Sequence, residues 1–185
     1  GLGYGFSSVK MMVKKLGALK VGDPASETTD VGPIARAELR DGLHAQVTKT
    51  IKEGASCLMG GEMPEGDGFF YPVTLLADVK PGMCAFTEET FGPVAPLIRF
   101  HSDDEVIQLA NDTEFGLASY FYSRDIGRVW KVAEALEYGM VGINTGIISN
   151  EVAPFGGVKQ SGFGREGSHY GIDEYMVLKY LCMGQ

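Results

Sequence analysis

Two adjacent carboxylates, Glu88 and Glu89, stand in the segment TEETFGP at residues 87–93. This segment leads into an apolar run that starts at Val94. A carboxylate at the edge of a strand can accept two hydrogen bonds from a sugar diol, and a neighbouring ring such as Phe91 can cover a planar cofactor. A solvated acidic turn is the alternative interpretation, because exposed carboxylates are the norm in folded proteins.

A second polar loop has the sequence NTGIISNE at residues 144–151, directly after a predicted strand over 140–144. Ligand sites of α/β sheets gather at the carboxyl ends of the strands. A small hydroxyl there, such as that of Ser149, could donate a hydrogen bond to a carboxylate or an oxyanion. An ordinary polar surface loop is the alternative.

The third candidate is the glycine-rich run PFGGVKQSGFGREG at residues 154–167, whose last six residues fit the pattern G-x-G-x-x-G. That pattern indicates a dinucleotide site only when a hydrophobic strand precedes it and a helix opens from it. Here the preceding residues are polar and rich in glycine, and no acidic residue follows at the required distance of about 20 residues. We therefore interpret the run as a tightly packed loop.

Composition narrows the classes of partner. The chain has 185 residues, a formal net charge of -8, 44% hydrophobic and 22% charged residues, which is typical of a globular protein. The negative charge argues against a nucleic-acid partner and against binding to an anionic membrane surface. No apolar run approaches the roughly 18 residues of a membrane-spanning helix.

Cysteines and histidines are few and scattered. The three cysteines and three histidines form no pair at metal-ligand spacing, so we expect no metal site and free thiols in a reducing compartment. The first residues lack an initiating Met and the pattern of a signal peptide, which predicts a cytoplasmic or mitochondrial-matrix protein that is not secreted. A start of this kind is typical of a fragment.

Helical and strand patterns alternate along the chain. Helices are predicted over residues 9–19, 35–53, a stretch after Ser102, and 125–136. Strands are predicted over residues 55–59, 71–77, 94–100, 117–122, 140–144 and 175–183. In the second helix, an apolar residue at every fourth position predicts one buried face, made of Leu39, Leu43, Val47 and Ile51. This order predicts an α/β fold with a largely parallel sheet.

Together the three loops resemble the aldehyde dehydrogenase family. Residues 87–93 are similar to its E-E-x-F-G-P segment, and residues 154–166 to its P-F-G-G-x-K-x-S-G-x-G-R-E segment. The segment KVGDP at residues 20–24 and a later Gly-Pro at 32–33 match in order and spacing. The resemblance implies an open twisted sheet with flanking helices, a partial catalytic domain over 1–172, and a C-terminal oligomerisation strand over 173–185.

Within the family, residues 144–155, 171–175 and 179–182 are similar to succinate-semialdehyde dehydrogenases. This implies oxidation of succinate semialdehyde to succinate with NAD or NADP, by an enzyme that is a homo-oligomer. The resemblance places Glu89 on the nicotinamide ribose, Phe91 beside the nicotinamide, Ser149 on the substrate carboxylate, and Phe155 near the substrate tunnel. A related semialdehyde or aliphatic aldehyde dehydrogenase is the alternative within the family.

The family's mechanism uses a cysteine thiolate that attacks the aldehyde and a glutamate that activates water. No residue of this sequence matches either one, so we assign no catalytic residue. Cys57, Cys84 and Cys182 are interpreted as structural thiols, with Cys84 in a loop. We therefore expect the isolated chain to have no dehydrogenase activity. A truncated, non-catalytic protein that acts through assembly, and a freestanding nucleotide-binding module, are the remaining alternatives.

Overall fold

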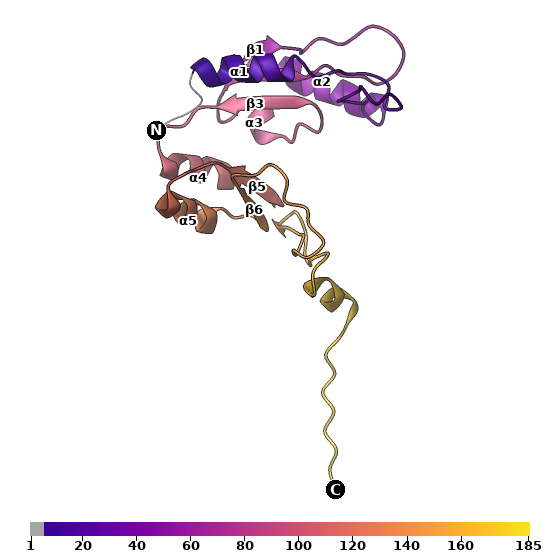
Figure 1. The fold of residues 1–185 in the computed structure, drawn as a ribbon, viewed down its shortest axis with the longest axis vertical. Coiled ribbons are helices and arrows are strands. Elements are labelled where there is room, and N and C mark those ends of the chain that lie inside the picture. The colour runs from indigo at the N-terminus through magenta and orange to yellow at the C-terminus, as the bar shows by residue number, and fades with distance from the viewer. Residues whose placement is uncertain (1–5) are drawn as a thin grey trace. The chain divides into compact units, whose positions relative to one another are not determined.

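The computed structural model describes residues 6–185, which pack as two compact units (Figure 1). Unit 1 runs to Ser102 and unit 2 from Asp103 to Gln185. Each unit has its own helices and its own small sheets, so each is described by itself. The predicted functional boundary at residue 172 stays a prediction.

Unit 1 contains three helices and one three-stranded sheet. The helices are α1 (Phe6–Leu16), α2 (Ala37–Lys52) and α3 (Cys84–Thr87). The strands are β1 (Ser56–Met59), β2 (Thr74–Val79) and β3 (Val94–Ile98). β2 lies in the middle, antiparallel to β1 and parallel to β3. In Figure 1, α2 runs along this sheet.

The apolar stripe of α2 is only partly buried. Leu43 and Val47 lie in the core, whereas Leu39 is 42% exposed and Ile51 is 36% exposed. Successive residues of an α-helix are about 100° apart around its axis, so two residues four positions apart differ by about 40°. The two ends of the predicted face therefore turn away from the sheet, and the prediction holds for its centre.

The core of unit 1 forms where α2, β2 and α3 meet. Its buried members are Leu43, Val47, Ala55, Tyr71, Leu76, Val79 and Ala85. Two buried hydroxyls beside the core are hydrogen-bonded: Thr50 donates to the Gln46 carbonyl (2.8 Å) and Thr74 to the Pro72 carbonyl (2.9 Å). Because these polar groups have partners, burying them carries little penalty.

Unit 2 contains two helices, a 3-10 turn and two strand pairs. The helical elements are α4 (Asp103–Asn111), α5 (Ile126–Ala135) and η1 (Tyr170–Tyr175). β4 (Phe115–Gly116) pairs antiparallel with β7 (Val158–Lys159), and β5 (Ala118–Phe121) pairs parallel with β6 (Met140–Ile143). Asp125 caps α5, because its carboxylate accepts a hydrogen bond from the Arg128 amide at 2.7 Å.

The structure confirms the α/β class and corrects three details. The predicted sheet is divided into three small sheets with mixed pairing rather than a largely parallel one. Cys84 is not in a loop but begins α3, where it is buried. The predicted strand over 175–183 is not formed: residues 176–185 carry no regular secondary structure, and their side chains are exposed. A strand needs a hydrogen-bonded neighbour, and none of the residues 6–185 supplies one here.

In residues 6–185 no helix combines the length and the apolar character that crossing a membrane requires. Within the same range no group of His, Cys, Asp and Glu side chains is arranged to hold a metal ion.

Candidate functional site

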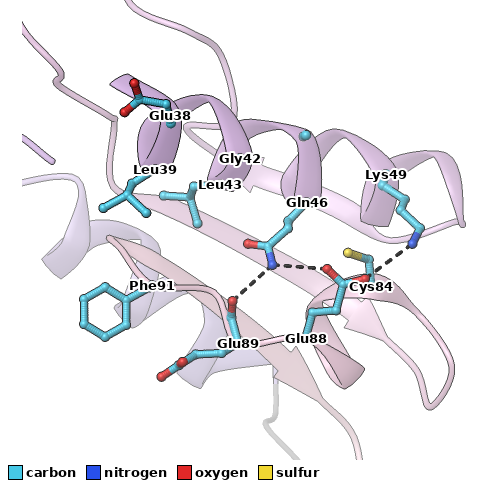
Figure 2. A pocket seen from close by; sticks show the side chains of 11 residues that line it. Glu38, Leu39, Gly42, Leu43, Gln46, Lys49, Cys84, Glu88, Glu89 and Phe91 are labelled. Atoms are coloured by element: carbon cyan, nitrogen blue, oxygen red, sulfur yellow. Dashed lines mark hydrogen bonds and ion pairs between the residues drawn. The ribbon is translucent and has the colours of Figure 1, made fainter. Parts of the chain in front are cut away.

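A cavity of about 470 Å³ lies in unit 1 between α2 and the loop that follows α3 (Figure 2). One wall is α2, and the other is the loop around residues 88–91. The lining residues are Glu38, Leu39, Gly42, Leu43, Ala45, Gln46, Lys49, Cys84, Glu88, Glu89 and Phe91. The cavity therefore joins a helix face to the loop in which the sequence predicts cofactor binding.

Two side chains, Thr50 of α2 and Glu53 at its C-cap, bind the first turn of α3. The Cys84 amide donates to Glu53 Oε2 at 2.7 Å, and the Ala85 amide donates to Thr50 Oγ1 at 3.0 Å. These amides belong to the first turn of a helix, where backbone donors have no partner within the helix. Side chains from α2 supply the partners, so α3 and the loop after it are tied to α2.

Gln46 links α2 directly to the loop. Its Nε2 donates to Glu88 Oε2 at 3.3 Å and to the Glu89 carbonyl at 3.1 Å. Lys49, almost one turn further along α2, forms an ion pair with Glu88 at 3.5 Å. Figure 2 shows these three contacts on the same side of the cavity. The first carboxylate of the acidic pair is thus held by protein groups.

The environment of Glu88 changes the acidity of two groups. The Gln46 amide, then the Cys84 thiol and the Lys49 ammonium, stabilise the Glu88 carboxylate and lower its pKa. Burial, followed by the hydrogen bond to Glu88 and its charge, raises the pKa of the Cys84 thiol. A thiol whose pKa is raised stays protonated, so Cys84 is a poor nucleophile.

Glu89 and Phe91, the two residues predicted to bind a cofactor, lie together at this cavity. Phe91 is 78% exposed. The Glu89 carboxylate points away from Gln46 in Figure 2, and among residues 6–185 it has no hydrogen-bonded partner. An unpaired carboxylate can accept hydrogen bonds from two hydroxyl groups of a ligand, and the exposed ring beside it offers the ligand a flat apolar surface.

Ser149 and Phe155, predicted to contact the substrate, lie in unit 2. Phe155 forms a two-residue bridge with Glu166, with N–O distances of 2.8 and 2.7 Å, and lines a second cavity beside Arg165. Ser149 is exposed in the loop after β6 and does not line this cavity. Unit 2 therefore does not bring these two side chains to one cavity.

The glycine-rich run is a packed loop, as predicted. Arg165 Nη1 donates to the carbonyls of Gly157 and Gly164 at 2.8 and 2.7 Å, which crosslinks the two halves of the run. Gly156 allows a close approach, since a Cβ there would lie 2.5 Å from the Gly164 carbonyl oxygen. No α-helix opens from residues 162–167, which agrees with the rejection of a dinucleotide-binding turn.

Sequence reasoning missed the α2 side of the first cavity. The sequence analysis assigned no role to Gln46 or Lys49 of this helix. The available signal was their position: Gln46 lies three residues after Leu43, and Lys49 three residues after Gln46, so both flank the buried stripe on one helix face. Only the fold shows that the acidic loop passes along this flank.

Comparison with known proteins decides the family. The family model described as "Aldehyde dehydrogenase family" matches residues 7–181. The chain belongs to the aldehyde dehydrogenase family. The family assignment and its α/β fold are therefore confirmed.

Similar relatives of this aldehyde dehydrogenase chain are named for semialdehyde substrates. It is 56% identical to a glutarate-semialdehyde dehydrogenase of Pseudomonas putida over 89% of its length. It is 51% identical to a succinate-semialdehyde dehydrogenase [NADP(+)] of Escherichia coli over 90% of its length. The crystal structure of a succinate-semialdehyde dehydrogenase from Burkholderia pseudomallei superposes with a TM-score of 0.92 and 55% identity, covering 96% of this chain.

The chain spans about a third of these relatives. It covers 34% of each of the two curated enzymes and 37% of the Burkholderia protein. What the relatives act on is therefore a matter of proposal for this chain.

Proposed function

We propose that this chain is part of the catalytic domain of an NAD(P)-dependent semialdehyde dehydrogenase, which oxidises succinate semialdehyde to succinate. The observation that carries the proposal is an identity of 51–56%, over about nine-tenths of the chain, to two enzymes named for dicarboxylic semialdehydes. Glutarate semialdehyde is the second candidate substrate, because the Pseudomonas relative carries that name. The two aldehydes share a remote carboxylate.

The cavity of unit 1 supports the cofactor part of the proposal. The Glu89 carboxylate has the chemistry to accept both hydroxyls of a ribose, and the exposed Phe91 ring can cover a nicotinamide face. A bound nicotinamide cofactor accepts a hydride from the aldehyde carbon. The role of the protein residues is to orient it for that transfer.

In unit 2 we assign Ser149 to the substrate carboxylate and Phe155 to the wall of the substrate tunnel. The Ser149 hydroxyl is exposed on the loop after β6, where it is accessible to a carboxylate. Holding the far end of the aldehyde orients its reacting carbon, which raises the rate of attack. The half-buried Phe155 supplies apolar surface.

The chain by itself is expected to be inactive. The attack on an aldehyde needs a thiolate, and the raised pKa of Cys84 keeps that thiol protonated. Cys57 lies in β1, and its Sγ contacts the carbonyls of Met59 and Gly60. Cys182 is exposed in the stretch without regular structure. At Cys84 the nearby Lys49 ammonium favours the thiolate, but burial and Glu88 outweigh it.

An exchange of segments tests the proposal. Residues 7–181 would replace the matching segment of the Escherichia coli enzyme, and NADPH formation would be followed with succinate semialdehyde, glutarate semialdehyde and propanal. We expect the hybrid to oxidise both semialdehydes and the chain alone to oxidise neither. NADPH formation by the chain alone would contradict the predicted inactivity, and a hybrid that prefers propanal would contradict the substrate class.

Two substitutions in this hybrid test the assigned residues. Ser149→Ala should raise the KM for succinate semialdehyde about tenfold, the size of one hydrogen bond to a charged group, and leave the KM for propanal unchanged. Glu89→Gln should raise the KM for the cofactor, whereas Glu62→Gln, at an exposed carboxylate of unit 1 that does not line the cavity, serves as the matched control. Equal effects on both aldehydes would remove Ser149 from the site.

A non-catalytic role in assembly is favoured by one observation. Several apolar side chains of residues 176–183 are almost fully exposed, among them Leu178, Tyr180 and Met183. Such a segment can add as a strand to the sheet of another copy. Size-exclusion chromatography with light scattering tests this role, and a clean monomer at high concentration would argue against it.

A further inference from the structure

The side chain of Gln46 contacts both acidic residues of the loop, Glu88 and Glu89. Its amide group carries two N–H donors, and the two acceptors within reach are Glu88 Oε2 at 3.3 Å and the Glu89 carbonyl at 3.1 Å. The first bond holds a side chain and the second holds the main chain of the next residue. Together they hold the Glu88 side chain and the Glu89–Thr90 peptide, and so the backbone on either side of Glu89.

The support beneath Gln46 is rigid. Gln46 lies in the third turn of α2, between the buried Leu43 and the buried Val47 and Thr50. Its own carbonyl accepts a hydrogen bond from Thr50 Oγ1 at 2.8 Å, and Thr50 Oγ1 in turn accepts one from the Ala85 amide at 3.0 Å. The donor therefore lies on a part of α2 whose neighbouring side chains are buried in the core of unit 1.

The far end of the loop is held by packing. A Cβ at Gly92 would collide with Leu43 Cδ2, so the loop backbone rests directly on α2 at that point. Glu89 and Phe91, which line the cavity, lie between Gly92 and the point where Gln46 holds the loop (Figure 2). Gln46 thus supplies the polar anchor at one end of the segment and Gly92 the apolar anchor at the other.

Gln46 also separates the two neighbouring carboxylates. It bonds the side chain of Glu88 but only the main chain of Glu89, so the Glu89 carboxylate faces away from α2. Lys49 contributes little to this arrangement, since its contact with Glu88 is long and both side chains are largely exposed. The orientation of Glu89 accordingly depends on the amide of Gln46.

We propose that Gln46 is a positioning residue that holds the Glu88 side chain and the Glu89–Thr90 peptide so that the Glu89 carboxylate faces the nicotinamide cofactor. This inference rests on the proposed function of Glu89. Gln46 itself touches no reacting atom, and its effect is expected in cofactor affinity rather than in the chemical step.

Three variants of the segment-exchange hybrid test the inference. Gln46→Glu keeps the shape but replaces the donor by a carboxylate, and should raise the KM for the cofactor about tenfold while kcat and the aldehyde KM stay within about twofold. Gln46→Lys retains N–H donors at this position and should keep the cofactor KM within about threefold of the parent value. Lys52→Ala is the control on α2, at an exposed side chain that does not line the cavity, and should leave all three constants unchanged.

A second readout does not depend on turnover. Because the Gln46 amide is the main group that lowers the pKa of Glu88, Gln46→Glu should raise that pKa in a ¹³C-detected titration of the side-chain carboxyl. An unchanged cofactor KM in Gln46→Glu, or an equal loss in Gln46→Lys, would overturn the positioning role. If the parent hybrid binds no cofactor, the proposed function itself is wrong. If the parent hybrid binds the cofactor and Gln46→Glu binds it equally well, only the inference about Gln46 is wrong.

Discussion

In unit 1, side chains from α2, β2 and α3 enclose an apolar core. In unit 2, the segments are held to one another largely by polar side chains that form hydrogen bonds with the backbone. Seven residues of unit 1 form one buried cluster, and in unit 2 the buried hydrophobic side chain is Val132. Trp130, two residues earlier, is 63% exposed. The family's motifs therefore lie beside an apolar core in unit 1 and on loops held by polar contacts in unit 2.

Polar links dominate unit 2. The Asn111 amide donates to the Ala135 carbonyl at 2.8 Å, and its oxygen accepts from the Glu137 amide at 2.9 Å. The Tyr138 hydroxyl donates to the Ala110 carbonyl at 2.6 Å. These bonds join the end of α4 to the segment after α5. The proposed cofactor residues thus sit on the apolar unit, and the proposed substrate residues on loops of the polar one.

The largest effect is expected from the core of unit 1. Leu76→Ala removes a fully buried side chain from β2 and should lower the free energy of unfolding by about 2–5 kcal/mol. The matched change in unit 2 is Leu178→Ala, at a fully exposed side chain, which should cost less than about 0.5 kcal/mol. Urea denaturation followed by circular dichroism measures both. Similar losses would break the contrast between the units.

A smaller effect is expected from the polar links of unit 2. Asn111→Ala removes two hydrogen bonds and leaves the Glu137 amide without its partner, which should cost about 1–3 kcal/mol. The control is Asn150→Ala, where a single exposed bond to the Val152 amide is lost. The same denaturation experiment compares them. If Asn111→Ala were neutral, unit 2 would be held by something other than its side chain–backbone bonds.

A pH-dependent effect is expected from Tyr71, whose hydroxyl lies 3.1 Å from His44 Nδ1 in unit 1. Burial raises the pKa of Tyr71 to about 12, because it disfavours the phenolate. The contribution of the neutral phenol to stability is complete below pH 10 and is lost as the pH rises toward 12.

The measurement is the free energy of unfolding between pH 8 and 11, in the parent chain and in Tyr71→Phe. The parent should lose stability relative to the variant above pH 10. A constant difference between the two proteins over this range would show that the phenol ionises in the folded state as easily as in the unfolded one.

The smallest effect is expected from the surface ion pairs of unit 2. Lys131 contacts Asp104 at 2.6 Å, but both side chains are more than half exposed. Exposed pairs of this kind are screened by water and salt, so Lys131→Met should shift the denaturation midpoint by no more than the experimental error. A clear loss that disappears at high salt would show that charge, as well as hydrogen bonding, holds α4 to α5.

Local signals predicted many elements of both units. β1, β3, β5, β6 and α5 lie within one or two residues of their predicted bounds, because their apolar periods and flanking turns are local features. The loop at residues 87–93 could also be singled out, since its motif is contiguous. The Gln46 contact could not be foreseen, because the residues that it joins lie 42 and 43 positions apart.

The sequence by itself determined the family, the alternation of helices and strands, and the loop in which Glu89 and Phe91 lie. Tertiary structure alone decided which part of the α2 stripe is buried, that Cys84 is buried in a helix rather than placed in a loop, and that residues 176–185 form no strand in this chain. The physical reason is the same in each case. Periodicity and turn chemistry act between near neighbours, whereas burial and strand pairing depend on which distant segment comes to lie alongside.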